Sequence, residues 1–169
     1  MTGERRDRGV ALARAARAGD TLALHELLDH LGPYVSRVCT PIALADGPDA
    51  VQETLLVVFR QLRSLKDPQA LYGWVRAVAV REAVRIARRA SRARPAELAD
   101  VPAGGDPQLA TDIDDVLARL SPEHRAVLVL RDVEGLDEQS AAALLRIPAG
   151  TAKSRLHRAR TSFRKAWSA

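Results

Sequence analysis

The sequence is poor in the residues that build covalent or metal-held frameworks. Its 169 residues include one cysteine, Cys39, and four histidines that are scattered along the chain without an H-E-x-x-H motif. A single cysteine excludes a disulfide scaffold and a cysteine-rich zinc site. The sequence also lacks a nucleophile–base–acid set and a phosphate-binding glycine loop, so it predicts no enzyme, no catalytic residues, no cofactor and no metal centre.

Long apolar runs and aromatic residues are also missing. No apolar run reaches the roughly 18 residues that a membrane-spanning helix needs, and no apolar stretch of a secretory signal follows the charged segment Met1–Arg8. The sequence therefore predicts no membrane insertion and a cytoplasmic location. Aromatic residues make up only 4% against 47% apolar residues, so Ala, Leu and Val must build the core. In that core Cys39 is expected to serve as a small buried hydrophobe.

Positive charge is plentiful but unevenly distributed. The net charge is +5 and the pI is about 10.1. Residues 81–94 carry six arginines and one acid, residues 95–124 carry seven acids and one arginine, and residues 146–165 carry seven basic residues and no acid. Two basic blocks that flank an acidic middle predict an anionic partner, most often a nucleic acid.

The acidic middle also concentrates residues that break helices, namely Pro95, Pro102, Gly104, Gly105 and Pro107. This composition predicts a linker over residues 95–111, between a first domain at 8–94 and a second at 112–169. The alternative is a long surface loop inside one domain, although loops of this length are uncommon in compact domains.

Both predicted domains are expected to be helical, which makes the fold class all-α, with two small domains joined by a flexible linker. Ala, Leu, Arg and Glu dominate these parts, and strand-like alternation is absent. The predicted helices are 10–18, 21–39, 48–64, 68–93, 112–120, 122–133, 138–145 and 149–167. Ser121 and Asp137 are expected to cap the helices that follow them.

The last two predicted helices have the layout of a helix-turn-helix motif, because a short turn at 146–148 joins them. In the second helix Ala152, Leu156, Ala159 and Phe163 form one narrow apolar stripe, and basic or small side chains occupy the other faces. Such a helix fits the major groove of duplex DNA. The alternative is a basic helix face that is simply solvated.

Three segments of this region resemble the promoter-binding C-terminal domain of extracytoplasmic-function sigma factors: Leu120–Arg125, Leu130–Leu136 and Pro148–Arg160. The resemblance implies that the second helix of the motif reads the upstream promoter element. The candidate residues for this contact, which are small or basic, are Gly150, Thr151, Lys153, Ser154, Arg155, His157 and Arg158. The chain departs from the family at Arg146, where a turn glycine is usual, so left-handed backbone strain is expected there.

A polar stripe on the predicted helix 48–64 is a candidate docking surface. The stripe follows i, i+3, i+4, i+7 and consists of Asp49, Gln52, Glu53 and Leu56. The opposite, core-facing side is assigned to Val51, Leu55, Val58, Phe59 and Leu62. From the residues alone, the stripe is either a docking surface for a basic helical partner or solvated surface.

The segment Asp46–Thr54, which contains most of this stripe, is similar to the sigma-factor segment that grips the clamp helices of the largest subunit of core RNA polymerase. The resemblance implies that Asp49, Gln52, Glu53 and Leu56 bind the polymerase.

The predicted helix 68–93 carries an arginine stripe. Arg81, Arg85, Arg88 and Arg92 recur on one face, and Trp74 precedes them on the same face. A basic stripe with an aromatic ring is typical of surfaces that hold single-stranded DNA. The alternative is that Trp74 packs in the core and the arginines are solvated.

The resemblance implies that this helix and the loop before it melt and hold the downstream promoter element. The residues assigned to this contact are Lys66, Gln69, Trp74, Arg81, Arg85 and Arg88. The family usually has Asn and Asp where this chain has Arg81 and Arg85, so we expect stronger non-specific attraction to phosphates here.

These features together predict a transcription initiation factor that binds core RNA polymerase and places double- and single-stranded promoter DNA. The alternative is a stand-alone helix-turn-helix regulator, which would have no use for the stripe at 49–56 and would need a dimerisation helix. The resemblance further implies an anti-sigma factor that holds the protein inactive.

Overall fold

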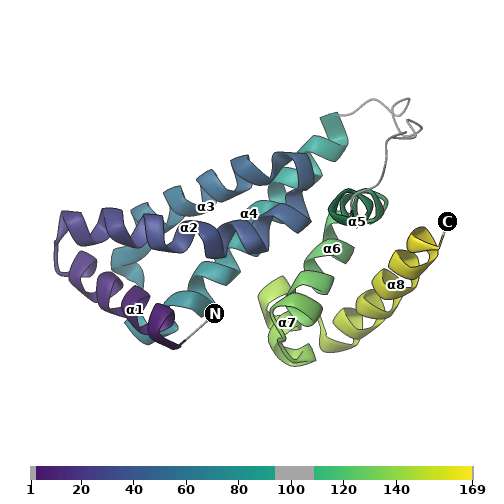
Figure 1. Cartoon of the computed structure of the whole chain (residues 1–169). Helices are drawn as coiled ribbons and strands as arrows, with labels where there is room; N and C mark the ends of the chain where they lie inside the picture. Colours follow the sequence, from purple (N-terminus) through teal and green to yellow (C-terminus); the bar gives the residue numbers. More distant parts are fainter. Residues whose placement is uncertain (1–2, 94–108, 169) are drawn as a thin grey trace.

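The protein has an all-α fold, as predicted. The computed structural model describes residues 3–93 and 109–168, and no β-strand occurs among them. Figure 1 shows the helices of the N-terminal half beside those of the C-terminal half. The helices are α1 (Gly3–Arg17), α2 (Thr21–Ala43), α3 (Gly47–Gln61), α4 (Leu71–Ala93), α5 (Leu109–Ala118), α6 (Pro122–Leu128), α7 (Glu138–Leu145) and α8 (Ala149–Trp167).

Shorter turns connect some of these helices. They are the 3₁₀ turns η1 (Leu44–Asp46), η2 (Leu62–Ser64) and η3 (Pro68–Ala70), and the π-helical turn η5 (Val129–Val133). Most of the predicted linker lies outside the described residues, and its last three positions, 109–111, already belong to α5. The domain boundaries at 94 and 112 therefore stay predictions.

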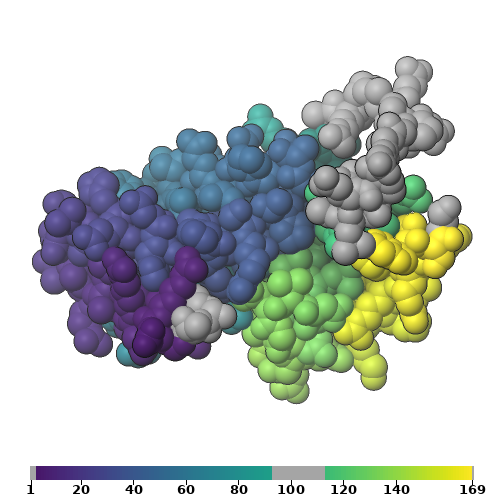
Figure 2. All heavy atoms as spheres, viewed as in Figure 1, coloured from purple at the N-terminus to yellow at the C-terminus, as the bar shows by residue number. Residues whose placement is uncertain are grey.

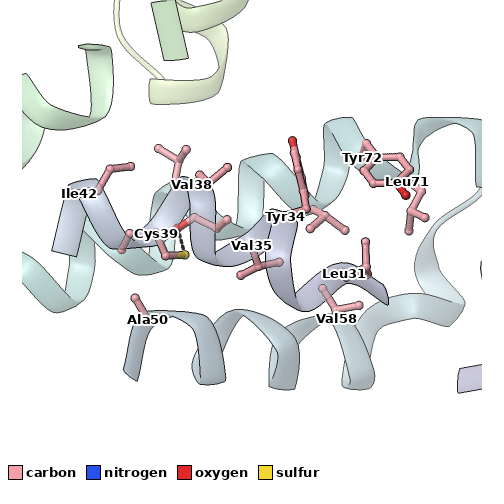
Figure 3. Packing of buried hydrophobic residues seen from close by; sticks show 14 of the residues in the cluster. Leu31, Tyr34, Val35, Val38, Cys39, Ile42, Ala50, Val58, Leu71 and Tyr72 are labelled. Carbon is pink, nitrogen blue, oxygen red and sulfur yellow. Dashed lines mark hydrogen bonds between the residues drawn. The ribbon is translucent and has the colours of Figure 1, made fainter. Parts of the chain in front are cut away.

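Helix α2 is the centre of the N-terminal half, since it contacts α1, α3 and α4. Its completely buried side chains recur at helical spacing and are Leu27, Leu31, Val35, Val38, Cys39 and Ile42. Figure 3 shows Ala50 and Val58 of α3 facing this row. Burial raises the pKa of the Cys39 thiol to about 11, so Cys39 serves as a small hydrophobe, as predicted.

Helices α1 and α2 run beyond their predicted bounds, because tertiary contacts stabilise residues that the apolar pattern leaves out. Helix α1 begins at Gly3, not at 10, and the Arg5 carbonyl oxygen accepts from the Tyr72 hydroxyl at 3.2 Å and lies 2.9 Å from His30 Nε2. Helix α2 continues through Pro41 to Ala43, not to 39. Its last residues are buried, which offsets the hydrogen bond that Pro41 cannot make.

One predicted core position is wrong. Phe59 is 50% exposed, whereas Ala50, Thr54 and Val58 are completely buried at i, i+4 and i+8. Thr54 fits the core because its hydroxyl donates to the Ala50 carbonyl oxygen at 2.7 Å. The apolar pattern selects Phe59 because two positions of the true core face, Ala50 and Thr54, hold a small residue and a polar residue.

The C-terminal half holds the helix-turn-helix motif α7–α8 beside α5 and α6. Its own buried cluster consists of Val116, Leu120, Val127, Leu156 and Ala159. The apolar stripe of α8 is therefore directed inward, as predicted, and Lys153, His157 and Arg158 on its other faces are exposed.

The predicted caps of this half are confirmed. The side chains of Ser121 and Asp137 accept from the backbone N–H groups of His124 and Ser140, at 3.3 and 2.8 Å. The predicted helix 122–133 is interrupted, because α6 ends at Leu128 and η5 follows. This wider turn leads into Glu134 and then into Gly135, which has φ +67°.

The two halves pack against each other. Ala126, Val129, Leu130 and Ala141 of the C-terminal half belong to the same buried cluster as the N-terminal core. Figure 2 shows the green surface of the C-terminal half in contact with the blue surface of the N-terminal half, and α6 contacts both α2 and α4. This interface sets how the predicted polymerase- and DNA-binding surfaces lie relative to each other.

A matched pair of glycine substitutions tests the contact that holds α1. A Cβ at Gly9 would lie 2.3 Å from the Tyr72 hydroxyl oxygen, whereas one at Gly73 would meet nothing within 4 Å. We expect Gly9→Ala to lower the free energy of unfolding by about 1–3 kcal/mol through overpacking. Gly73→Ala should raise it by about 0.5–1 kcal/mol. Urea unfolding followed by circular dichroism measures both, and equal effects of the two changes would contradict the Tyr72 contact.

Candidate nucleic-acid interface

The structure brings the predicted upstream-promoter residues to one face of α8. Gly150, Thr151, Lys153, His157 and Arg158 are exposed, and Ser154 and Arg155 are half-buried. The opposite stripe is buried at Ala152, Leu156 and Ala159. Because α7 and the turn before α8 fix the orientation of this helix, its N-terminal part can enter a major groove while α7 lies across it.

The turn between α7 and α8 carries the backbone strain expected at Arg146. Arg146 has φ 54° and ψ 47°, which is the left-handed conformation, and its N–H bonds to the carbonyl oxygens of Ala142 and Ala143. This arrangement is the C-terminal cap that a glycine normally makes without strain. The turn therefore keeps the geometry of the motif at the expense of a strained residue.

Three arginines of α4, Arg81, Arg85 and Arg88, are exposed. Both interpretations of the sequence, a DNA-binding surface and a solvated face, require this exposure. Arg85 is also paired within the N-terminal half, with Glu82 at 2.7 Å and with Glu53 at 3.9 Å. Arg81 Nε donates to the Ala77 carbonyl oxygen at 3.1 Å.

Both predicted DNA-binding surfaces meet at one cavity of about 500 Å³ between α4, α7 and α8. Five arginines of α4 line it together with Arg146 and Arg155, and Glu123 of α6 is the acid among the lining residues. Glu123 forms an ion pair with Arg88. The sequence prediction missed this pair, since 35 residues separate its members and neither carries a local signal.

The ion pair perturbs the titration of the acid. Burial acts to raise the pKa of Glu123, but a backbone hydrogen bond and the Arg88 guanidinium outweigh it and lower the pKa below its ordinary value. Beside it, burial and the charges of Arg155 and Arg158 lower the pKa of His124. His124 therefore stays neutral down to a lower pH than an ordinary histidine, next to the predicted upstream-promoter face.

Trp74 fits both interpretations of the sequence. It is half-buried and packs against the N-terminal core, yet it lines a hollow of about 340 Å³ with Gln69. The hollow also contains Tyr34, Arg37, Arg76 and, from the C-terminal half, Glu134, none of which the sequence analysis selected. Lys66 is exposed in the loop before α4 but is not among the lining residues.

The polar stripe of α3 is surface, as its pattern indicates. Asp49, Gln52 and Glu53 are exposed and Leu56 is half-buried. The first three line a shallow hollow with Arg85 and Arg89 of α4. The predicted polymerase-binding and downstream-DNA surfaces are therefore neighbours, and their opposite charges meet along the α3–α4 edge.

The described residues offer neither a metal-binding cluster nor a helix that could span a membrane. No group of three or more His, Cys, Asp or Glu side chains there could hold a metal ion. None of the described helices combines the length and the apolar character needed to cross a bilayer.

Comparison with known families and proteins identifies similar chains. The family described as Sigma-70, region 4 matches residues 110–163. The ECF RNA polymerase sigma factor SigE of Mycolicibacterium smegmatis is 34% identical over 131 residues, which cover 70% of this chain and 51%, about half, of that protein. The ECF RNA polymerase sigma-E factor of Haemophilus influenzae is 26% identical over 170 residues, and the alignment covers 89% of this chain and 90% of that protein.

Two solved structures have a similar fold. CnrH, in complex with the cytosolic domain of CnrY, matches with a TM-score of 0.63 at 23% identity and covers 94% of this chain and 96% of its own. The sigma factor RpoE from Bartonella quintana, in complex with the anti-sigma factor NepR, matches with a TM-score of 0.66 at 22% identity, over 85% of this chain and 96% of its own.

The strained turn gives a prediction about stability. Arg146→Gly should raise the free energy of unfolding by about 1 kcal/mol, because glycine adopts the left-handed conformation without the steric penalty of a side chain. Arg158→Gly, at an exposed position inside α8, is the matched control and should lower it by about 1 kcal/mol. Thermal and urea unfolding measure both changes. Destabilisation by Arg146→Gly would show that the side chain contributes more than the strain costs.

Proposed function

We propose that this chain, which is similar to extracytoplasmic-function sigma factors over most of its length, is a member of that family and initiates transcription by joining core RNA polymerase to promoter DNA. The observation that carries this proposal is the helix-turn-helix motif α7–α8, whose exposed face at Lys153, His157 and Arg158 lies within the matched region 4. In this role the exposed face of α8 contacts the duplex at the upstream promoter element.

The second part of the proposed role is binding to the polymerase. The exposed Asp49, Gln52 and Glu53, with the half-buried Leu56, offer acidic, amide and apolar groups at helical spacing on α3. Such a stripe suits a basic helical partner, and the clamp helices of the largest polymerase subunit are the partner we propose.

The third part is the handling of single-stranded DNA. Arg81, Arg85 and Arg88 of α4 provide positive charge along one helix, and Trp74, near the start of the same helix, lines a hollow with Gln69. Charge that follows the backbone and a ring that stacks on a base are what strand separation requires. The proposed work is binding and strand separation, without covalent catalysis, and it takes place in the cytoplasm.

We also propose a protein inhibitor as a partner. The similar proteins CnrH and RpoE were solved in complex with the cytosolic domain of CnrY and with the anti-sigma factor NepR. An anti-sigma factor that covers the α3 stripe or the α8 face of this chain would prevent the contacts proposed above.

Capture of core RNA polymerase on the immobilised chain tests the proposed function. The variant Gln52→Ala/Glu53→Ala/Leu56→Ala should bind polymerase at least about ten-fold more weakly, because it removes the centre of the docking surface. The control Glu4→Ala/Leu22→Ala/Gln61→Ala changes the same residue types at exposed positions elsewhere and should bind like the wild type. If the wild type binds duplex DNA but no polymerase once co-purifying inhibitors are removed, the chain is a stand-alone regulator instead.

The arginines of α4 give a second prediction. Arg81→Asn/Arg85→Asn should lower the slope of log affinity for single-stranded DNA against log salt concentration by about 1.4, since each lost phosphate contact contributes about 0.7. Arg14→Asn/Arg60→Asn removes the same charge at exposed positions of α1 and α3 and should leave the slope almost unchanged. Fluorescence anisotropy with a labelled oligonucleotide at several salt concentrations measures the slope. Equal slopes for both variants would contradict a contact of Arg81 and Arg85 with the phosphates of the DNA.

A further inference from the structure

Glu134 of the C-terminal half is buried against basic and phenolic groups of the N-terminal half. Its side chain is only 4% exposed. The Arg37 guanidinium donates to Oε1 at 2.7 Å, and the Tyr34 hydroxyl and the Arg76 guanidinium donate to Oε2 at 3.0 and 3.4 Å. One carboxylate therefore receives three hydrogen bonds from α2 and α4, across the interface between the halves.

The three donors belong to two helices of the N-terminal half that pack against each other. Tyr34 and Arg37 lie one turn apart on α2, and Arg76 lies on α4, which packs against α2 in the N-terminal core. The Tyr34 ring packs edge-on against Tyr72 at 5.4 Å, and the Arg37 guanidinium lies over the Tyr34 ring at 5.4 Å. Burial first, and the Glu134 carboxylate second, raise the pKa of Tyr34, so its hydroxyl stays protonated and donates.

The chemistry of this donor set fits a phosphate. Two guanidinium groups and a phenol present donors to one small anion, which is how proteins hold carboxylate and phosphate oxygens. Among the described residues, Arg76 Nε has no hydrogen-bond acceptor although it is buried. A DNA phosphodiester offers two charged oxygens, as a carboxylate does, and adds two ester oxygens, which are weaker acceptors available to this donor.

The position of the donor set points to nucleic acid as the source of the phosphate. Tyr34, Arg37 and Arg76 line the same hollow as Gln69 and Trp74, which are proposed to contact the downstream promoter element. Glu134 alone is acidic among the described residues that line this hollow. The same pattern recurs where Glu123 of α6 pairs with Arg88 of α4.

We propose that Tyr34, Arg37 and Arg76 form a phosphate-binding site for single-stranded promoter DNA, and that Glu134 occupies this site as an internal competitor until the DNA displaces it. The inference rests on the proposed function, since it assigns the phosphate to promoter DNA. In the structure described here the chain is closed, because the carboxylates of the C-terminal half cover arginines of the N-terminal half. Binding of single-stranded DNA and closure of the chain then exclude each other.

The test compares two variants of the full chain that each lose one negative charge. Glu134→Gln keeps the shape of the side chain but weakens its hold on the arginines, whereas Asp115→Asn neutralises an exposed acid of the same half. The probe is a labelled oligothymidylate, because a phosphate site does not depend on base sequence. We expect Glu134→Gln to bind it about five-fold or more tightly than the wild type, as for a typical coupling between sites, and Asp115→Asn to bind like the wild type.

A second comparison separates the phosphate site from simple opening of the chain. Arg37→Ala/Arg76→Ala in the Glu134→Gln background should lose the gain in affinity, while circular dichroism confirms that the variant is folded. If the gain survives, Glu134 only holds the halves together, and the phosphate site is overturned. Equal affinities of Glu134→Gln, Asp115→Asn and the wild type also overturn it, even where the polymerase capture assay supports the proposed function.

Discussion

Arg125 of the C-terminal half is only 5% exposed, and its guanidinium joins the two halves by donating to backbone carbonyl oxygens of both. Its Nε donates to the Ile42 carbonyl oxygen at 2.7 Å, and Nη1 donates to the Leu117 and Leu120 carbonyl oxygens at 3.2 and 2.6 Å. Burial lowers the pKa of Arg125, but an arginine remains charged at physiological pH. A buried cation that lost these carbonyl partners would strongly destabilise the packed arrangement of the two halves. Arg125 therefore keeps its three carbonyl partners while the halves are packed together. The end of α2 and the start of α6 are thereby fixed side by side, and the other contacts between the halves depend on this arrangement.

With α6 fixed on α2, one acid on α6 and one acid after it come to face the arginines of the first half. Glu123 at the start of α6 meets Arg88, and Glu134 after the π-helical turn meets Arg37 and Arg76. This gives part of the uneven charge pattern a structural meaning, because carboxylates of the second half neutralise cations that would otherwise attract phosphate. The molecule can therefore hold its basic surfaces in a closed state without an added anion.

The parts of the fold that follow from the sequence are those that local interactions determine. The bounds of α7 and α8, the caps at Ser121 and Asp137, and the left-handed Arg146 all depend on residues within one or two turns. The exposed face of α8 could likewise be predicted from the helical spacing of its apolar side chains. The exposure of Phe59 has a local cause, because the core face of α3 uses Thr54, whose hydroxyl bonds within the same helix. Contacts between distant residues determine what else the sequence did not reveal: the start of α1 depends on Tyr72, and Glu134 meets Tyr34 across 100 residues. No spacing rule connects such positions.

The two acidic contacts differ in how strongly they hold. The Arg88 side chain is 54% exposed, so its pair with Glu123 is screened by salt and contributes little, as surface ion pairs usually do. Glu134 is shielded from solvent and receives three hydrogen bonds, so salt weakens this contact far less. Its release needs a competing anion that offers the same donors equivalent oxygens, because Arg76, whose side chain is only 21% exposed, would otherwise lose an acceptor of its guanidinium. A nucleic-acid backbone meets this requirement, since it brings a phosphate to the site and further phosphates to the arginines of α4 in the same binding event. The strength of closure is thus governed mainly by the buried carboxylate, and its reversibility by the several phosphates that one strand supplies.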